Sequence, residues 1–285
     1  MSLIENDSKF TIIHNDAKYI SNIFDAIANI IDNGTLEINS DGLYISGMDE
    51  SHTSFIDLVL DKDDLSEFSF NSVKSIKLGI ILKEFVKILK VGDKNDKLLL
   101  ENINNETLII SFISDGITRK YSMKLINNDF PKIQVPDMDY QMELDISSKL
   151  FTKIINSITI LDSEHIEFAV KNSKLTLKSP GDYSDIDLTF NKSENEIIKK
   201  KIKLSKNMDN NKIVEKSEFS YKLYKSYGDF TSSFGLNIIK KISKINNIAD
   251  NILCSLSPDF PIKFEYHLNK ETNSIITFHI TPKII

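Results

Sequence analysis

Apolar residues recur at helical spacing in four stretches of the chain and alternate with polar residues in many of the others. The spacing predicts amphipathic helices over 16–31, 78–92, 147–161 and 234–246. Alternation between them predicts short strands, since side chains of a strand point to opposite faces in turn. The expected strands lie near residues 36–38, 43–45, 56–60, 97–100, 107–113, 120–125, 166–170, 175–177, 186–190, 264–268 and 275–280.

This order of helices and strands occurs twice. With a shift of about 130 residues, TLEINSDGLYISGMDESHTSFIDLVL (35–60) falls on HIEFAVKNSKLTLKSPGDYSDIDLTF (165–190). The last helix of each half matches under a larger shift, which places an insertion between Phe190 and Phe234. We interpret the pattern as a duplicated α+β domain. Chance similarity between two α+β halves is the alternative.

The stretch from Leu125 to Tyr140 has neither period. Pro131 and Pro136 exclude regular pairing and favour extended backbone, yet spaced apolar residues remain. We interpret the stretch as an extended connector with some side chains docked, although a loop covering a core edge is the alternative. The expected domains are therefore 1–125, a connector over 126–140, and 141–285 with an insertion near 191–216.

Composition narrows the class of protein. The chain has 285 residues, 41% hydrophobic residues and 27% charged residues, as soluble globular proteins do. It has no apolar run long enough to span a bilayer and no secretory signal, so we expect no membrane contact. The single cysteine, Cys254, allows no intrachain disulfide and favours a reducing compartment.

Lysines follow one face of the repeated helices, although the net charge is −6. Lys83, Lys87 and Lys90 recur at i, i+4 and i+7, and the matching helix of the second half carries Lys240, Lys241 and Lys244. The helix over 147–161 adds Lys149 and Lys153. Repeated positive faces on an acidic protein favour contact with phosphates without base readout. An ordinary solvated face is the alternative.

Motifs for catalysis are absent from the sequence. There is no Gly-rich phosphate loop, dinucleotide fingerprint, nucleophile elbow or paired cysteine motif. Asp49, Glu50 and His52 could ligate a metal, but we interpret them as a polar loop between strands. We therefore expect no enzymatic activity, no metal and no cofactor.

Five stretches resemble one family. DGLYISGMDESHTSFIDLVL (41–60) is very similar to the signature of the proliferating cell nuclear antigen (PCNA) family of eukaryotic and viral sliding clamps. LGIILKEFVKILKVGDKNDKLLL (78–100) resembles its lysine-bearing helix, and YSMKLINNDFPKIQVPDMDY (121–140) its interdomain connector. PDFPIKFEYHL (258–268) and TPKII (281–285) resemble its last strands and tail. The resemblance covers nearly the whole chain outside 191–233.

The resemblance implies an α+β fold of two similar DNA-clamp domains, assembled as a homotrimeric ring with pseudo-six-fold symmetry. Such a ring encircles duplex DNA, independently of sequence, and tethers DNA polymerase and other replication and repair proteins. It needs a separate clamp loader and works in the nucleus or a viral replication compartment. By position, the DNA-facing residues are Lys83, Lys87, Lys90, Lys153, Lys240 and Lys244.

The resemblance also implies two protein-binding surfaces. Partner peptides carrying the PIP-box motif would bury apolar anchors under the connector. The matching positions are Met48, His52, Phe55, Ile133, Val135, Pro136, Tyr140, Phe260, Pro261, Thr281, Pro282, Lys283 and Ile284. Subunits would pair the strand at 115–124 with the strand at 175–182, and the interface residues would be Tyr121, Ile158, Leu161 and Lys178.

Two departures from the family pattern stand out. Phe55 and Phe260 replace smaller aliphatic residues, which implies a shallower or reshaped peptide pocket. The first helix offers Ser21, Asn22 and Ala28 where the family has basic residues, which implies weaker or lopsided DNA contact.

Two other functions stay open from the sequence. A clamp-like polymerase accessory or late transcription factor that forms no closed ring would be favoured by a bulged, polar edge at 115–124. A repeat-built enzyme would be favoured by a deep pocket of converging ionisable groups.

Overall fold

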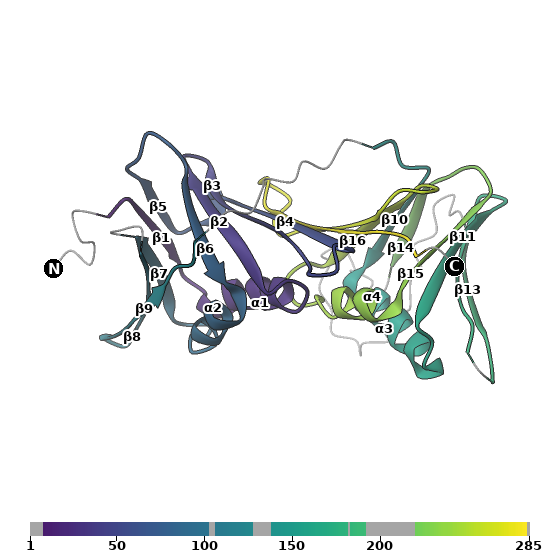
Figure 1. Ribbon diagram of the computed structural model, residues 1–285, viewed down its shortest axis with the longest axis horizontal. Helices are drawn as coiled ribbons and strands as arrows, with labels where there is room; N and C mark the ends of the chain where they lie inside the picture. The colour runs from purple at the N-terminus through teal and green to yellow at the C-terminus, as the bar shows by residue number, and fades with distance from the viewer. Residues whose placement is uncertain (1–7, 103–105, 128–137, 182, 192–219, 284–285) are drawn as a thin grey trace, which may run out of the picture. The chain divides into compact units, whose positions relative to one another are not determined.

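A computed structural model describes residues 8–102, 106–127, 138–181, 183–191 and 220–283. The contacts of the chain divide it into two compact units (Figure 1). Unit 1 comprises residues 1–138, 247–249 and 261–281, and unit 2 comprises residues 139–246, 250–260 and 282–285. Most of the expected connector and of the expected insertion near 191–216 lies outside the described residues.

Unit 1 holds two α-helices, a short 3₁₀ helix and eleven described strands. They are β1 (Phe10–His14), α1 (Ala17–Ala28), β2 (Asn33–Asn39), β3 (Gly42–Met48), β4 (Ser54–Asp61), η1 (Lys62–Asp64), β5 (Glu67–Phe70), β6 (Ile76–Ile81), α2 (Leu82–Leu89), β7 (Lys97–Asn102), β8 (Thr107–Ser114), β9 (Ile117–Lys124), β17 (Ile262–His267) and β18 (Ile275–Ile280).

Unit 2 repeats the pattern. Its described elements are β10 (Met142–Ser147), α3 (Ser148–Ile158), η2 (Thr159–Leu161), β11 (His165–Lys171), β12 (Lys174–Ser179), β13 (Ile186–Asn191), β14 (Tyr221–Ser226), β15 (Phe230–Gly235), α4 (Leu236–Ser243) and β16 (Asn251–Leu256).

Strand order confirms the internal duplication. The run β4-β3-β2-β6 in unit 1 corresponds to β13-β12-β11-β15 in unit 2, and β5-β1-β7 corresponds to β14-β10-β16. The hairpins β8–β9 and β17–β18 complete the two repeats. Every one of these pairings is antiparallel. The α+β fold of two similar repeats is thus the observed one.

The grouping differs from the expected domain of 141–285 in one respect. Strands β17 and β18 belong to unit 1 because β18 pairs with β4, with Phe278 opposite Ile56. The last strand of the second repeat is therefore bonded to the first repeat.

The helices bury one face each and lie side by side in pairs, α1 with α2 and α3 with α4 (Figure 1). The rings of Phe24 on α1 and Phe85 on α2 meet edge to face at 4.9 Å between centroids, and both are fully buried. Asp16 and Ser147 cap α1 and α3 by accepting hydrogen bonds from backbone N–H groups of the first turn. Among the described residues, no helix is long and apolar enough to cross a membrane.

Two predicted helices were too long at their N-terminal ends. Residues 78–81 belong to strand β6, and residues 234–235 to β15, so α2 and α4 each begin directly at a strand end. A hydrogen bond from Leu82 N to Asp32 O, and one from Leu236 N to Glu164 O, fixes the two junctions alike. Strands β1, β5, β6, β10, β14, β15 and β16 were not predicted.

Candidate functional site

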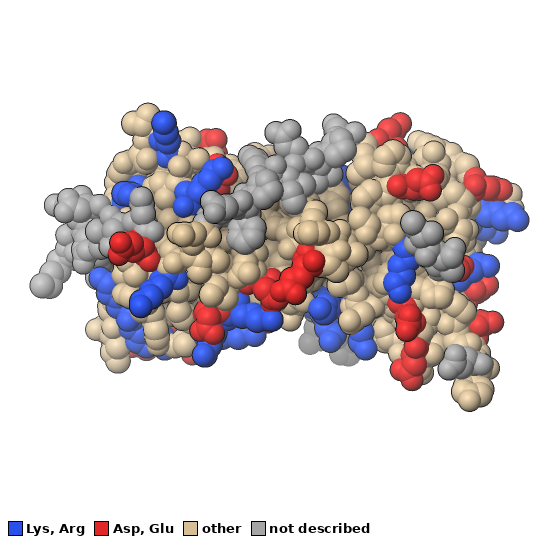
Figure 2. Space-filling view, in the orientation of Figure 1, with Lys and Arg blue, Asp and Glu red and all other residues tan. Residues whose placement is uncertain are grey.

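The lysines of α2 project from unit 1, but carboxylates face them. Lys83, Lys87 and Lys90 are all exposed. Their ion pairs are Lys83–Asp32 at 2.5 Å, Lys90–Asp25 at 2.7 Å and Lys87–Glu84 at 3.8 Å. The hydrogen bond and charge of Asp32 raise the pKa of Lys83. Figure 2 shows basic and acidic side chains interspersed over the part of unit 1 that carries its helices.

The lysines of unit 2 have a different surrounding. Lys153 on α3 is exposed, as is Lys244 at the end of α4, whereas Lys240 is half-buried. Within the described part of the chain, Lys240, Lys241 and Lys244 form no ion pair with a carboxylate. The predicted clustering of lysines on the helices is therefore present in each unit, and it is partly neutralised in unit 1.

Asp49 organises the loop between β3 and β4. Its carboxylate accepts hydrogen bonds from Thr53 N at 2.8 Å, Ser54 N at 2.6 Å and Thr53 Oγ1 at 3.0 Å, and a further one from the Ser51 hydroxyl. Partial burial by itself would raise the pKa of Asp49, but these hydrogen bonds lower it overall. Both carboxylate oxygens of Asp49 accept hydrogen bonds from within the loop. The residues between β3 and β4 therefore form a polar loop, which agrees with the sequence-based interpretation.

That loop holds part of the predicted peptide-binding surface together. Met48 at the end of β3 is directly opposite Phe55 on β4, which is opposite His279 on β18. The Phe55 and His279 rings lie 6.0 Å apart. Exposed Thr281 donates its N–H to Thr53 O at 2.9 Å, and His52 occupies the left-handed backbone region at φ 55°.

His279 was not predicted for this surface, because the sequence shows it only as an isolated histidine. Burial, with a smaller contribution from the charge of Lys263, lowers its pKa to about 4. The ring is therefore neutral at physiological pH and completes a row of three uncharged side chains from β3, β4 and β18.

The other predicted peptide positions divide into two groups. Ile133, Val135, Pro136 and Ile284 lie outside the described residues, and Pro261 is half-buried in unit 1. In unit 2, Tyr140 is buried and Phe260 is 46% exposed. Lys283 donates its N–H to Ser233 O at 2.7 Å, which fixes the start of the tail after Pro282.

The prediction that the strand at 175–182 pairs with another subunit is wrong. It corresponds to β12, which is hydrogen-bonded to β11 on one side and to β13 on the other, so it has no free edge. Among the described strands, the edges of that sheet are β13 and β15. Lys178 of β12 reaches the edge strand β13 only through an ion pair with Asp187, at 3.9 Å.

The strand at 115–124, predicted as the other side of the subunit contact, lies at the edge of its sheet among the described strands. Strand β9 ends the order β5-β1-β7-β8-β9, and its pairing with β8 runs without a register shift from Ile117 to Lys124. Tyr121 packs edge to face on Phe112 at 6.0 Å. The regular register does not favour the bulged edge expected of a non-ring relative.

Arg119, the single arginine of the chain, anchors this edge strand. It forms an ion pair with Asp96, whose side chain is 6% exposed, and its guanidinium lies 5.5 Å from the Phe112 ring centroid. A hydrogen bond from Asp93 N lowers the pKa of Asp96 and outweighs its burial, with further contributions from Ser114 and Arg119. Arg119 thereby fastens β9 to the turn before β7.

We expect Arg119→Gln to lower the free energy of unfolding by about 1–2 kcal/mol at neutral pH, because a buried carboxylate loses a charged donor. The pKa of Asp96 is lowered by folding, so its contribution is present above the unfolded pKa and disappears as pH falls through the folded value. Urea unfolding at about pH 7 and pH 3 should therefore show a smaller loss in acid. Lys94→Gln, at an exposed lysine away from the edge, is the control, and an equal loss at both pH values would contradict the assignment.

Two predicted interface residues differ in exposure. Ile158 is fully buried within the chain and has no surface left for a partner, while Leu161 is half-buried. Between them Ile160, which is not among the predicted interface residues, is 77% exposed.

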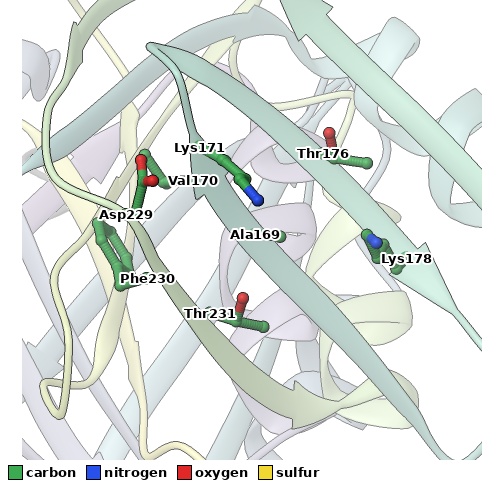
Figure 3. Close-up of a pocket in the computed structure, with 8 residues that line it drawn as sticks. All are labelled: Ala169, Val170, Lys171, Thr176, Lys178, Asp229, Phe230 and Thr231. Atoms are coloured by element: carbon green, nitrogen blue, oxygen red, sulfur yellow. The ribbon is translucent and has the colours of Figure 1, made fainter.

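A cavity of about 490 Å³ lies on β11, β12 and β15 of unit 2 (Figure 3). Small side chains line its floor, with Ala169 opposite both Thr176 and Thr231. Asp229 accepts a hydrogen bond from Asn172 N at 3.2 Å and belongs to the adjoining turn. Lys171 and Lys178 lie on different strands (Figure 3). Its one carboxylate, Asp229, is engaged by the adjoining turn, so the lining does not favour the enzyme alternative.

Comparisons with known proteins agree with this architecture. A family model described as "Proliferating cell nuclear antigen, N-terminal domain" matches residues 10–132. "Proliferating cell nuclear antigen 2" of Drosophila melanogaster is 26% identical over 268 residues, covering 93% of this chain and 94% of that protein. "DNA polymerase sliding clamp 3" of Sulfurisphaera tokodaii is 27% identical over 271 residues, covering 94% and 97%.

A viral protein and a crystal structure extend the similarity. "Probable DNA polymerase sliding clamp 2" of Paramecium bursaria Chlorella virus 1 is 22% identical over 283 residues, covering 96% of this chain and 91% of that one. The crystal structure of the proliferating cellular nuclear antigen from Entamoeba histolytica matches with a TM-score of 0.78 and 22% identity, covering 97% of this chain and all of that one. This last match shows that the fold is shared.

Proposed function

This chain belongs to the proliferating cell nuclear antigen family, and from that premise we propose that it is a DNA sliding clamp that tethers DNA polymerase to duplex DNA. The observation that carries the proposal is the duplicated order of strands and lysine-bearing helices. The clamp performs no chemical step itself. The names of the eukaryotic and viral relatives support a place of action where DNA is replicated, in a nucleus or a viral replication compartment.

The duplication itself indicates how chains would join. In unit 1, β4 is bonded to β18, the last strand of the second repeat. By the correspondence between the repeats, β13 is the equivalent of β4, and β9 is the equivalent of β18. Each of these two is an edge among the described strands. We propose that β9 of one chain pairs with β13 of the next, so that the junction between chains copies the junction within the chain. A heterologous contact of this kind forms a ring when the rotation from each chain to the next closes after a whole number of chains.

Charge supports this pairing. On the solvent face of β9, Lys120 and Lys124 are exposed. Next to and within β13, Asp185 and Asp187 are exposed. Opposite charges on facing strands favour the intended neighbour over self-pairing of identical edges. The proposed interface therefore includes Tyr121 on β9, while Lys178 takes part only through its ion pair with Asp187 of β13.

DNA binding would be weak for each contact and independent of sequence. Lys83, Lys87 and Lys90 of α2 would face phosphates together with Lys153, Lys240 and Lys244 of unit 2. Ammonium groups on phosphates carry no base information, so the protein can slide. Retention then depends on enclosure of the duplex, and opening the ring is assigned to a separate clamp loader.

Partner proteins would dock on the row formed by Met48, Phe55 and His279. A short peptide with apolar and aromatic anchors suits this row, because anchors that fill a desolvated pocket supply most of the binding free energy. His52 and Thr281 are exposed beside it and can contact the flanks of such a peptide. DNA polymerase is the proposed partner, along with other replication and repair proteins that carry a clamp-binding motif.

The proposal predicts the mass of the protein in solution. Multi-angle light scattering of the purified chain should give three times the monomer mass of 32.5 kDa. Dilution should not reduce that mass at micromolar concentrations. A strictly monomeric species at these concentrations would contradict the ring and favour the alternative of an accessory factor without a closed ring.

A further inference from the structure

Each unit presents a pair of helices with lysines, but among the described residues only unit 1 brings a carboxylate against the lysine at the end of its second helix. We propose that Asp25 neutralises Lys90 and so suppresses phosphate binding by unit 1, leaving most of the DNA contact to unit 2. The inference rests on the proposed sliding-clamp function and assigns Asp25 and its counterpart Asn156 as the residues that set the unequal shares.

The ion pair in unit 1 is specific in its geometry. Lys90 Nζ lies 2.7 Å from Asp25 Oδ1, and the Asp25 side chain is 39% exposed while that of Lys90 is 51% exposed. The pair joins the last turn of α2 to the last turn of α1. A phosphate approaching Lys90 must compete with this carboxylate and also meets its repulsion. Both effects vanish when the carboxylate becomes a neutral amide.

The second repeat has no acidic residue at the position equivalent to Asp25. Aligning the first residues of α1 and α3, Ala17 and Ser148, places Asn156 where α1 has Asp25. The equivalent junctions of α2 and α4, at Leu82 and Leu236, place Lys244 where α2 has Lys90. Thus unit 1 has Lys90 with Asp25, and unit 2 has Lys244 with Asn156.

A second acidic position shows the same difference between the two units. Asp32 and Glu164 are equivalent, because each accepts the hydrogen bond that starts the following helix, from Leu82 N and Leu236 N respectively. Asp32 pairs with Lys83 of α2 at 2.5 Å. Glu164 instead lies 4.0 Å from Lys283 in the tail. In unit 2, Glu164 thus faces a lysine that lies outside α4.

Two reciprocal substitutions test the inference. Asp25→Asn gives unit 1 the residue of unit 2, and Asn156→Asp gives unit 2 the residue of unit 1. Binding of each variant to a labelled linear DNA duplex is measured by fluorescence anisotropy over a NaCl series. Asp63→Asn, which removes an exposed charge from the short helix η1, is the control for net charge.

We expect Asp25→Asn to bind more tightly and with a steeper salt dependence, by about 0.9 in the log–log slope for each added phosphate contact. The gain over wild type should shrink by roughly three- to fourfold per contact between about 50 and 200 mM salt. Asn156→Asp should weaken binding and flatten the slope. Asp63→Asn should leave the slope unchanged.

The outcomes separate this inference from the function on which it rests. If Asp25→Asn matches Asp63→Asn, or Asn156→Asp binds as wild type does, the inference is wrong while salt-dependent binding of the wild type still supports the clamp. If the trimeric wild type shows no salt-dependent binding to duplex DNA, the proposed function itself fails, and the inference with it. Light scattering on each variant checks that assembly is intact.

Discussion

Reversing the charge of the β9 edge with Lys120→Glu and Lys124→Glu should turn the trimer into a monomer, so that the mass from light scattering falls threefold to 32.5 kDa. The two glutamates would face Asp185 and Asp187 across the proposed junction. Like charges directly opposite destabilise strand pairing, and a wrong charge match across an interface costs several kcal/mol. The ring should open because every one of its junctions carries the same mismatch.

A second set of changes makes this prediction specific. Adding Asp185→Lys and Asp187→Lys to the same chain restores opposite charges at each junction, and the trimer mass should return. Lys94→Glu with Lys97→Glu changes two exposed lysines of unit 1 away from the edge and should leave the mass unaltered. If the charge-swapped chain stays monomeric while the control assembles, pairing of β9 with β13 is not the junction.

Replacing Asp49 with alanine should weaken binding of a PIP-box peptide by roughly thirtyfold, about 2 kcal/mol, without changing the trimer mass. The carboxylate accepts four hydrogen bonds within the loop that precedes β4, and their donors would be left without it. Unsatisfied donors of this kind cost about 1–3 kcal/mol. The loop would relax by rearranging Thr53, which accepts the hydrogen bond from Thr281 N.

A graded series identifies the cause of that loss. Both backbone donors, Thr53 N and Ser54 N, reach Oδ1, so Asp49→Asn can keep them through its carbonyl oxygen and should retain most of the affinity. Asp63→Ala is the matched carboxylate control. Isothermal titration calorimetry measures each variant, and an Asp49→Ala affinity equal to that of wild type would refute the role of the loop.

The pKa of Asp49 adds a pH dependence with a definite sign. Because folding lowers that pKa, the loop is stabilised above the unfolded value and loses this stabilisation as pH falls through the folded value. Peptide affinity should accordingly be constant between about pH 7 and 5 and fall only in stronger acid.

Helix boundaries show what the sequence could and could not indicate. Helices α1 and α3 are capped by the side chains of Asp16 and Ser147, which precede them, and their starts were predicted to within one residue. The residues that precede α2 and α4, Ile81 and Gly235, supply no side-chain cap. Without a cap, the apolar run of β6 continued the helical pattern and was assigned to the helix.

The site was predictable in its residue types and less so in its partners. Periodicity found the lysine face of α2, because side chains three and four positions apart share a face. It could not find Asp25 and Asp32, since their contacts with α2 arise only when α1 and α2 pack together. The mistaken choice of β12 over β13 has a similar cause, because which strand ends a sheet depends on pairing that one sequence does not display.

Cys254 lies on β16 with 1% of its surface exposed, and burial raises the pKa of its thiol. A maleimide dye needs an accessible thiolate, so the native sulfur should stay unlabelled in the folded protein. A fluorescent donor and acceptor can therefore be attached at new cysteines flanking β9 and β13 without replacing any native residue. Energy transfer between neighbouring chains would then report, in real time, each event in which the junction separates.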